Sequence, residues 1–298
     1  MAFRQHQLRY FVTAAEEGQV TLAAEKLHVA QPALSNAIAQ LESELGLQLF
    51  DRHSRGITLT NDGEVFLEKA LAALAAAEDA SLAAEALVRA SQGTIAFGYM
   101  GLPPAFTNQD LMATFTDTHP NVVVSLRELP FPSLPTASWL GEVDAAICTR
   151  PAADPNVVFQ SLRAEPRLVL VPSTHPLAQR SELAVAEVLD ETFLSFDPSI
   201  DPAWAGLWSL DDHRGGPPAQ TISEQVTTPQ QRFAMLAGGR GIATAPACYA
   251  VAIANALPSV VAIPLTDAEP VILTLVGRTD RQSPAVEALF ATARHLAA

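Results

Sequence analysis

Several residue types and motifs are scarce or absent in this 298-residue chain. It contains two cysteines, Cys148 and Cys248, whose wide separation provides neither a disulfide framework nor a zinc-binding spacing. Its only lysines, Lys26 and Lys69, do not follow a glycine, so there is no Walker-type phosphate-binding loop. The seven histidines form no H-E-x-x-H motif, and no G-x-S-x-G segment is present. We therefore expect a protein that is not an enzyme and that holds neither a cofactor nor a metal.

Long uninterrupted apolar runs are also missing. The N-terminus lacks the apolar segment of a secretory signal. Residues 241–265 carry no charge, but Pro246, Pro258 and Pro264 interrupt them, which favours a strand, a helix and a strand in a buried core over a membrane span. We expect a soluble, cytoplasmic protein without membrane contact.

Positive charge is scarce as well. The formal net charge is −14, while 49% of the residues are hydrophobic and 17% are charged, a composition typical of a folded globular protein. Such an acidic chain is unsuited to wrapping nucleic acid over its whole surface. It can still bind DNA through one small module, because only the face near the phosphates must be positive.

Residues 1–60 are predicted to form a compact helical block, because apolar residues recur there at helical spacing in three segments. Gly18 and Gly46 are placed to end the first and the third helix. Pro32 is predicted at the first position of the third helix, where its missing N–H does no harm. A short helix starting at Thr21, a three-residue turn and a longer helix together predict a helix-turn-helix. The inward-facing residues are expected to be Leu8, Phe11, Val12 and Ala15, then Leu22, Ala23 and Leu27, then Leu34, Ile38, Leu41 and Leu45.

The segment after Gly46 is predicted to form a two-stranded wing. A polar turn, "DRHSRG", is followed by the alternating stretch "ITLT" from Ile57. Thr60 or Asn61 then begins a long helix that runs to about Ala90. Its leucines cannot be buried by one helix alone, which predicts a partner helix.

From Gly93 onward, strand-like and helical segments alternate, which predicts βαβ units and a parallel sheet. The predicted strands are 94–99, 122–129, 143–149, 167–173, 192–196, 241–246 and 271–278. The predicted helical segments include 108–120, 181–189, 227–239 and 283–296.

The outer face of the third helix is polar at its N-terminal end, where helix-turn-helix proteins meet base edges. Gln31 and Asn36 can each pair with adenine, and Ser35 can reach several bases. Arg52 and Arg55 in the wing are placed to meet phosphate or the minor groove. Residues 1–60 nevertheless carry five basic and six acidic side chains, so DNA affinity must depend on local placement and on a dimer that doubles the contacts.

Leu8–Leu67 resembles the LysR-type transcriptional regulators, through the ordered segments "LAAEKLHVAQPALS", "LESELGLQLFDR" and "LTNDGE". The resemblance continues in "GEVDAAI" from Gly141, "LVLVPSTHPLA" from Leu168 and "VTTPQQRFAMLAGGRGIATAPA" from Val226, so it spans nearly the whole chain. It implies a ligand-responsive regulator that binds double-stranded promoter DNA. The DNA contacts expected from this reading are Thr21, Gln31, Pro32, Ala33, Ser35, Asn36, Arg52 and Arg55.

The resemblance also implies the domain organisation. Residues 1–60 are expected to be an all-α winged helix-turn-helix and residues 61–90 a linker helix that mediates dimerisation. Residues 91–298 are expected to be an α/β two-lobed effector domain like a periplasmic binding protein, with lobe I at about 91–163 and 267–298 and lobe II at about 164–266. Members of the family usually form homotetramers, and RNA polymerase is a further expected partner.

Two positions depart from the family pattern. Ala30 stands where a serine often caps the third helix, which forgoes roughly 0.5–2 kcal/mol of capping. Asn36 stands where the family often has a basic residue, so a phosphate-seeking charge is replaced by an amide. Both departures bear on which operator sequence the protein prefers.

The effector site is predicted from the resemblance alone, between the two lobes. Methionine and phenylalanines at this place suggest an apolar or aromatic effector, with Arg150 placed to pair with an anionic group. The predicted residues are Tyr99, Met100, Gly101, Leu102, Phe131, Pro132, Thr149, Ser195, Phe196 and Thr228.

Two other classes of function are compatible with the sequence. An enzyme or solute-binding protein built on the α/β lobes would turn over or bind a ligand without affinity for DNA. A redox sensor would use Cys148 and Cys248 as its switch, so that an oxidant alone would change DNA binding.

Overall fold

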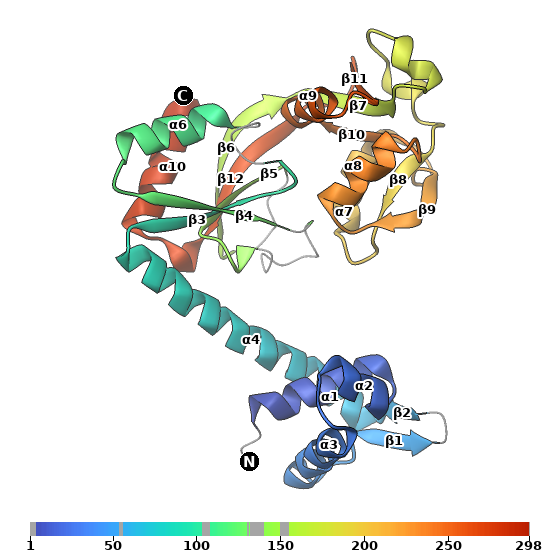
Figure 1. Ribbon diagram of the computed structural model, residues 1–298, viewed down its shortest axis with the longest axis vertical. Coiled ribbons are helices and arrows are strands. Elements are labelled where there is room, and N and C mark those ends of the chain that lie inside the picture. Colours follow the sequence, from blue (N-terminus) through green and yellow to red (C-terminus); the bar gives the residue numbers. More distant parts are fainter. Residues whose placement is uncertain are drawn as a thin grey trace. The chain divides into compact units, whose positions relative to one another are not determined.

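The computed structural model describes residues 4–53, 56–102, 108–129, 131, 140–149 and 155–297 (Figure 1). Arg55, Pro132 and Arg150 therefore lie outside the described residues. The chain divides into two compact units, Met1–Ala84 and Glu85–Ala298. Of the described helices, none is long and apolar enough to cross a membrane.

The first unit is helical with a small sheet, as predicted. Its core is built around Phe11, which packs at ring-centroid distances of 5.3 Å from Phe50 and 5.2 Å from Phe66. Leu34, Ile38 and Leu41 complete it from the third helix. The elements are α1 (Gln5–Glu17), α2 (Val20–Lys26), α3 (Gln31–Leu45), β1 (Phe50–His53), β2 (Gly56–Leu59) and α4 (Asn61–Ser91).

Glycines end the helices where the sequence predicted. Gly18 and Gly46 take left-handed φ angles of 64° and 70°, which residues with a Cβ adopt at a cost. Pro32 lies at the second helical position of α3 and not at the first, because the helix begins at Gln31. The consequence is the same, since the first four N–H groups of a helix have no partner inside it.

The prediction for α2 needs two corrections. The helix begins at Val20, one residue before Thr21, and the side chain of Leu22 is 43% exposed instead of facing inward. Ala23 and Ala24 are the buried residues of this short helix. Leu22 lies on the opposite side because a helix of 3.6 residues per turn places adjacent positions about 100° apart.

The predicted wing is present as an antiparallel pair, with Arg52 opposite Ile57. Gly56 has a φ of 146°, and a Cβ there would lie 2.3 Å from the carbonyl oxygen of Gly18. The Ile57 N–H donates to that same oxygen at 2.8 Å, so the wing is held against the end of α1. Thr60 begins α4 as its cap, because its Oγ1 accepts from the Gly63 N–H at 3.0 Å.

The second unit has two lobes, each with its own sheet (Figure 1). The first sheet has the strand order β4-β3-β5-β12-β6, and helices α6 and α10 pack together on it. Its elements are β3 (Thr94–Tyr99), α6 (Gln109–Thr118), β4 (Val123–Glu128), β5 (Ala145–Cys148), β6 (Val157–Glu165), β12 (Val271–Arg278) and α10 (Pro284–Ala297).

The second lobe contains the three-stranded sheet β10-β7-β11 and the pair β8-β9. Its elements are β7 (Arg167–Pro172), β8 (Phe193–Phe196), α7 (Pro202–Trp208), β9 (Thr221–Val226), α8 (Pro229–Ala237), β10 (Ala243–Pro246), α9 (Ala247–Ala256) and β11 (Val260–Pro264). Short 3₁₀ helices are η2 (Pro176–Gln179), η3 (Val185–Glu187), η4 (Asp211–His213) and η5 (Thr279–Arg281).

The α/β class is confirmed, but the sheet predicted to be parallel is mixed. β3 pairs in parallel with β4 and β5, whereas β12 is antiparallel to β5 and β6. The chain returns to the first sheet from the second lobe through β12, so its direction is set by that crossing and not by a βαβ unit. Likewise, residues 181–189 form only the single turn η3, because Leu183, Val185 and Val188 are buried in a small cluster there.

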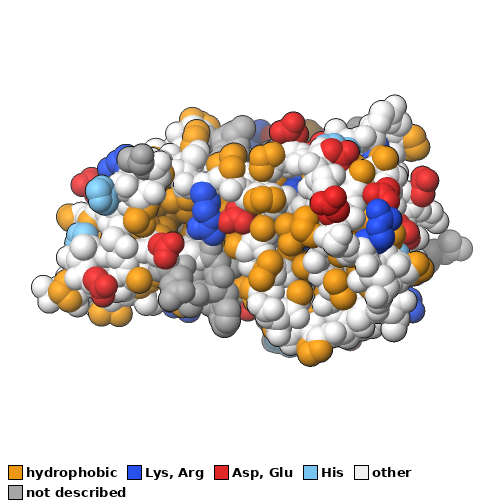
Figure 2. Space-filling model, turned by 90° about the horizontal axis from the view of Figure 1, so that it is seen from above, with side chains coloured by type: hydrophobic (Ala, Val, Ile, Leu, Met, Phe, Trp, Pro, Cys, Tyr) orange, Lys and Arg blue, Asp and Glu red, His pale blue; other side chains and the backbone are white. Residues whose placement is uncertain are grey.

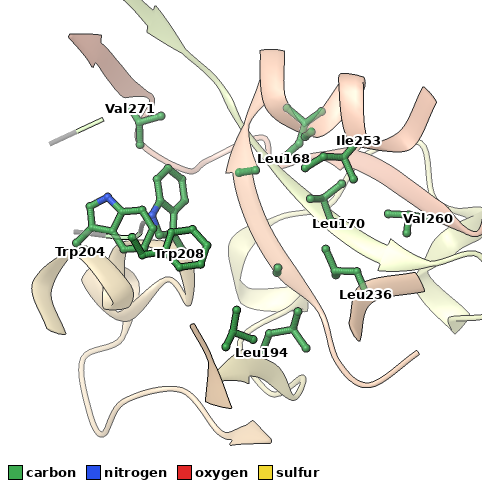
Figure 3. Close-up of a cluster of buried hydrophobic side chains, with 14 of the residues drawn as sticks. Leu168, Leu170, Leu194, Trp204, Trp208, Leu236, Ile253, Val260 and Val271 are labelled. Atoms are coloured by element: carbon green, nitrogen blue, oxygen red, sulfur yellow. The ribbon is translucent and has the colours of Figure 1, made fainter. Parts of the chain in front are cut away.

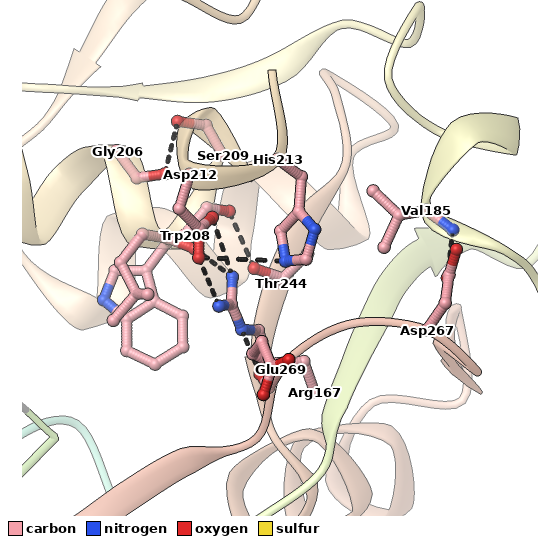
Figure 4. Close-up of polar contacts among 11 residues, drawn as sticks. Arg167, Val185, Gly206, Trp208, Ser209, Asp212, His213, Thr244, Asp267 and Glu269 are labelled. Carbon is pink, nitrogen blue, oxygen red and sulfur yellow. Dashed lines mark hydrogen bonds and ion pairs between the residues drawn. The ribbon is translucent and has the colours of Figure 1, made fainter. Parts of the chain in front are cut away.

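Arg167 fixes η4 to the sheet of the second lobe (Figure 4). This side chain is 2% exposed, and its guanidinium donates to both carboxylate oxygens of Asp212 and to the carbonyl oxygens of Leu207 and Glu269. Burial opposes ionisation of the Asp212 carboxyl, but the hydrogen bonds and the positive charge of Arg167, together with smaller contributions from His213 and the backbone, outweigh it, and the pKa of Asp212 is lowered.

The end of α4 is fixed to the first sheet by a second ion pair. The Arg89 guanidinium donates to the two carboxylate oxygens of Asp144 at 3.2 and 2.9 Å. The Ala96 N–H of β3 donates to the same buried carboxylate at 2.8 Å. The Asp144 carboxylate therefore joins the end of α4 to the backbone of β3.

We predict that Asp144→Ala lowers the free energy of unfolding of the second unit by about 2–4 kcal/mol, because the Arg89 guanidinium and a buried N–H lose their acceptor. Urea unfolding of the full chain, followed by circular dichroism, measures the change. Glu224→Gln removes the exposed pair with Arg240 and is the control, with an expected change below about 1 kcal/mol. Equal effects of the two substitutions would contradict the role given to Asp144.

Candidate functional site

The first candidate site is the N-terminal end of α3. Leu34, Ile38 and Leu41 face the core, so the remaining positions of the first turns point outward. Gln31, Pro32, Ala33 and Asn36 are exposed, and Ser35 is half-buried. The helix thus presents small and amide side chains at the end that enters the major groove in helix-turn-helix proteins.

Gln31 and Ser35 lie one turn apart and are linked. The Gln31 Nε2 donates to the Ser35 Oγ at 3.2 Å, which orients both polar groups on the same exposed face. Ala30 provides no side-chain cap, as the sequence indicated. Pro32 has no N–H, and the N–H groups of Ala33 and Leu34 donate to the Ala30 carbonyl at 2.9 and 3.2 Å, so DNA contacts at this end of α3 depend on side chains.

Thr21 and Arg52 lie on the elements that flank α3. Thr21 is exposed in the first turn of α2, and Arg52 is exposed on β1 of the wing. In the described part of the chain, no carboxylate forms an ion pair with Arg52, so its charge is available for phosphate. Arg55 lies outside the described residues, so the predicted pair of wing arginines is represented by Arg52 alone.

The rest of the chain offers little basic surface. From Gly93 onward it has eleven basic and twenty acidic residues. On the face shown in Figure 2, lysine or arginine side chains lie singly among acidic and apolar ones. Phosphate binding is therefore disfavoured on that face.

The second candidate site lies in the second unit, at the carboxyl ends of the parallel strands. β4, β3 and β5 are neighbours, so the residues that follow them lie at one edge of the sheet. Ligands bind at this edge in many open α/β sheets. Met100, Phe131 and Thr149 follow the three strands and meet the second lobe there.

A cavity of about 80 Å³ lies at this place, between side chains of both lobes. Ordinary small-molecule pockets enclose roughly 300–1,000 Å³, so the lobes are closed around a small space. Its lining residues include Met100, Gly101, Phe131, Cys148, Thr149, Trp204, Trp208, Pro229, Arg232, Phe233, Thr244 and Tyr249.

The structure brings together only part of the predicted effector set. Met100, Gly101, Phe131 and Thr149 line the cavity. The other described members lie outside its lining, namely Tyr99, Leu102, Ser195, Phe196 and Thr228.

Two of these hydroxyl groups already have local partners. The Thr228 Oγ1 caps α8 by accepting from the Gln231 N–H at 3.2 Å. The Ser195 hydroxyl donates to the Phe196 carbonyl at 3.3 Å. Both hydroxyl groups therefore already form hydrogen bonds to the protein backbone.

Aromatic residues of α7, which the sequence analysis missed, form much of the wall. Trp204 and Trp208 pack with ring centroids 5.8 Å apart, and both belong to the buried cluster drawn in Figure 3. Phe131 lies 5.2 Å from Trp204 and 5.3 Å from Phe196. The sequence does place two tryptophans four residues apart, a spacing that puts both on one face of a helix. This spacing could have predicted an aromatic helix face.

Arg232 of α8 was also missed. Its side chain is 9% exposed and lines the cavity. Its Nη2 donates to the Thr244 carbonyl at 3.0 Å, and its guanidinium carbon lies 4.8 Å from the centroid of the Phe196 ring. Burial lowers the pKa of Arg232 to about 10, so the group stays protonated at neutral pH.

The two cysteines lie in different surroundings. Cys148 is buried on the cavity wall, and Cys248 is half-buried at the start of α9. Burial and the Glu165 carboxylate raise the pKa of Cys248 to about 11, which disfavours the reactive thiolate. Among the described residues, no group of three His, Cys, Asp or Glu side chains could hold a metal ion.

Comparisons with known proteins agree with this arrangement. Residues 5–64 match the family model described as a bacterial regulatory helix-turn-helix protein of the lysR family, and residues 89–298 match the LysR substrate binding domain. The chain is 33% identical to the HTH-type transcriptional regulator XapR of Escherichia coli over 287 residues, which cover 95% of each protein. It is 31% identical to BenM of Acinetobacter baylyi over 244 residues, 80% of this chain and 79% of BenM.

Two solved structures have a similar fold. Full-length CbnR in complex with its target DNA gives a TM-score of 0.54 at 23% identity and covers 99% of this chain and 100% of CbnR. Full-length BenM gives a TM-score of 0.51 at 27% identity, with coverage of 98% and 96%.

We predict that Gly101→Ala destabilises the protein by about 1–3 kcal/mol. Gly101 has a φ of 75°, and a Cβ would lie 2.9 Å from the Pro229 Cβ across the cavity. The free energy of unfolding from urea titration measures this effect. The control is Gly216→Ala, because Gly216 has no atom within 4 Å of an added Cβ. If Gly101→Ala lowers the free energy of unfolding no more than Gly216→Ala does, the contact between position 101 and Pro229 is not tight.

Proposed function

The chain belongs to the LysR family of bacterial transcriptional regulators, and we propose that it acts at promoters as a homo-oligomer whose DNA binding is set by a small molecule. It is a DNA-binding regulator with an effector-binding domain, and its family is one of regulators rather than enzymes. The observation that carries the proposal is the exposed polar end of α3, in the same unit as a wing on which Arg52 is exposed.

We assign base reading to the first turns of α3. Gln31, Ser35 and Asn36 provide the hydrogen-bonding groups, and Pro32 and Ala33 provide close approach and apolar contact with thymine methyl groups. Asn36 can donate to and accept from one adenine, a pairing that a basic residue at this position could not make. This pattern favours operators with adenine and thymine at the contacted positions.

We assign backbone contact to the flanking elements. Arg52 supplies charge to a phosphate from the wing, Arg55 is its proposed neighbour, and Thr21 supplies a hydroxyl from α2. One such module carries little positive charge, so two or more copies on one operator are needed for tight binding.

Oligomerisation is proposed through α4. Large apolar side chains are exposed along this helix, among them Val65, Leu71, Leu87 and Val88. A helix with exposed leucine and valine side chains is stabilised by packing against a second helix. We propose a dimer through α4 and a homotetramer as the working form in the cytoplasm, with RNA polymerase as a further partner and no membrane contact.

The small molecule is proposed to act through the two lobes of the second unit. Because the cavity of about 80 Å³ lies between them, a larger ligand can enter only when the lobes move apart. A ligand that contacts both lobes then stabilises one arrangement over another, and this difference is transmitted as a difference in DNA affinity. Met100, Gly101, Phe131 and Thr149 are the proposed contacts from the first lobe.

We predict that Ser35→Ala and Asn36→Ala each weaken specific binding to the protein's own upstream DNA by about 5- to 100-fold, since each lost base contact costs roughly 1–3 kcal/mol. Arg52→Ala is expected to weaken binding to all DNA sequences alike and to reduce the salt slope by about 1. Gel-shift titrations at several salt concentrations, with specific and scrambled DNA, separate the two effects.

The matched control for this experiment is Gln40→Ala. Gln40 is exposed on the same helix but bonds to Glu44 in its C-terminal half. Unchanged specificity in Ser35→Ala and Asn36→Ala would remove base reading from α3. Failure of the unaltered protein to retard its upstream DNA at any salt concentration would overturn the proposed function.

We predict that Leu71→Asp lowers the oligomer mass at micromolar concentration, because a carboxylate would be buried against a partner helix without a counter-ion. Sedimentation equilibrium of the full chain measures the mass. Glu68→Gln is the control on the same helix, since Glu68 is fully exposed and pairs with Lys69. An unchanged mass in Leu71→Asp would place the interface elsewhere.

A further inference from the structure

Arg232 is a buried cation that lacks a carboxylate partner in the described part of the chain. Its guanidinium donates to the Thr244 carbonyl and lies over the Phe196 ring. Two other arginines of this unit are each paired with a carboxylate, since the buried Arg167 binds both oxygens of Asp212 and the half-buried Arg89 binds both oxygens of Asp144. Arg281 is also buried and donates to the Gly141 carbonyl. A buried charge is costly unless it is paired, so the environment of Arg232 is electrostatically incomplete.

No described carboxylate lines the cavity that Arg232 faces. The segments that follow β3 and β4, residues 103–107, 130 and 132–139, contain neither Asp nor Glu, whereas residues 150–154, which follow β5, carry Arg150 and Asp154 and lie outside the described residues. The Thr244 hydroxyl, on the same wall, is already used, because it donates to the Trp208 carbonyl at 2.8 Å. The protein thus offers no negative charge to this guanidinium within the described wall.

A second observation concerns hydrogen-bond donors. The Nε1 atoms of Trp204 and Trp208 are buried and have no hydrogen-bond partner in the structure as described. Both indole rings line the same cavity, and Figure 3 shows the two side chains beside each other. Buried tryptophan N–H groups normally find an acceptor, so two unpaired donors in one wall indicate that an acceptor arrives from outside the protein.

The remaining wall is apolar. Met100, Phe131, Ile147 and Leu170 contribute hydrocarbon or aromatic surface, and no cationic side chain besides Arg232 is among the described lining residues. One cation, two N–H donors and an apolar surround match a single anionic head attached to a hydrophobic body. Among the described lining residues, a multiply charged head would find no second cation.

We infer that the effector is an organic carboxylate with an apolar or aromatic body, whose carboxylate is held by the Arg232 guanidinium beside the indole N–H groups of Trp204 and Trp208. This inference rests on the proposed control by a small molecule in the cavity. Arg232 and the tryptophans belong to the second lobe, whereas Met100, Phe131 and Thr149 belong to the first. The carboxylate therefore anchors the ligand to one lobe, and its body contacts the other.

The protonation state of the anchor agrees with this role. The pKa of Arg232, lowered by burial to about 10, leaves the guanidinium charged at neutral pH. Its planar fork presents parallel N–H groups to a carboxylate, a geometry that a lysine ammonium does not reproduce. The Phe196 ring lies against the guanidinium and helps to fix its plane.

The test uses the full-length protein and carboxylates paired with their neutral primary amides: benzoate, phenylacetate, 3-phenylpropionate and hexanoate, with acetate as the anion that lacks a body. Binding is followed by the emission of the tryptophans and by the melting temperature. We expect at least one of the four carboxylates to bind, and its amide to bind at least about 10-fold more weakly.

Variants identify the anchor. Arg232→Gln is expected to weaken carboxylate binding about 10- to 100-fold without strengthening it for the amide, and Arg232→Lys is expected to retain part of the affinity. Trp208→Phe keeps the ring and removes the donor, so a loss of about 2- to 10-fold is expected. Arg240→Gln is the control, because this exposed arginine follows the same helix and pairs with Glu224.

Several outcomes would overturn the inference: amides that bind as tightly as their acids, Arg232→Gln with unchanged affinity, acetate binding as tightly as the larger acids, or no binding by any of the four carboxylates. If circular dichroism shows that Arg232→Gln does not fold, the inference is tested by the ratio of the affinities of the unaltered protein for each acid and its amide. Gel-shift binding of the unaltered protein to its upstream DNA is measured in parallel. If the protein binds DNA but no carboxylate, only this inference is contradicted. If it does not bind DNA, the proposed function is contradicted.

Discussion

Burying a guanidinium or a carboxylate costs solvation free energy, and only a well-placed partner compensates for this loss. The unit Glu85–Ala298 buries such groups in both lobes. Asp144 receives two arginine donors and one backbone N–H in the first lobe. Arg167 is satisfied by a carboxylate and two carbonyls in the second. These pairs fix the end of α4 and the turn η4, whereas Arg232 has no carboxylate partner among the described residues.

The cavity acquires its chemistry because two different kinds of wall meet there. The first lobe contributes the residues that follow parallel strands, where the backbone turns and Gly101 comes close to Pro229. The second lobe contributes the aromatic face of α7 and the cation of α8. In the proposed binding mode, a ligand places its charge in the second lobe and its body against both lobes, which couples binding to lobe arrangement.

The DNA-binding unit differs in where its polar groups lie. Its core is apolar and local, formed by residues close together in the sequence, and its chemistry is carried on the outside of α3. The polar side chains at that end are few and uncharged, and Arg52 supplies charge from the wing. In the proposed mode of binding, specificity depends on hydrogen-bond geometry at the bases, and affinity depends on several modules binding one operator together.

Local signals predicted much of this molecule. Gly18 and Gly46 end helices because their left-handed φ angles are readily adopted only without a Cβ, and Thr60 caps α4 because its hydroxyl reaches the next N–H groups. Strands such as β3 and β7 are continuous apolar runs that the sequence displays directly. The exposed set on α3 follows from helical periodicity alone, because the buried leucines define the opposite face.

Tertiary structure decided what depends on residues far apart in the chain. The antiparallel direction of β12 follows from the return of the chain from the second lobe, and residues 181–189 form only one 3₁₀ turn because burial overrides their helical pattern. Thr228 was predicted in the effector site but caps α8, while Arg232, four residues later, lines the cavity. The sequence by itself determined the elements, the family and the DNA-facing helix, because these depend on short-range spacing. Only the folded chain decided which side chains share a low-dielectric cavity, because burial and missing counter-charges are properties of neighbours that the sequence does not place together.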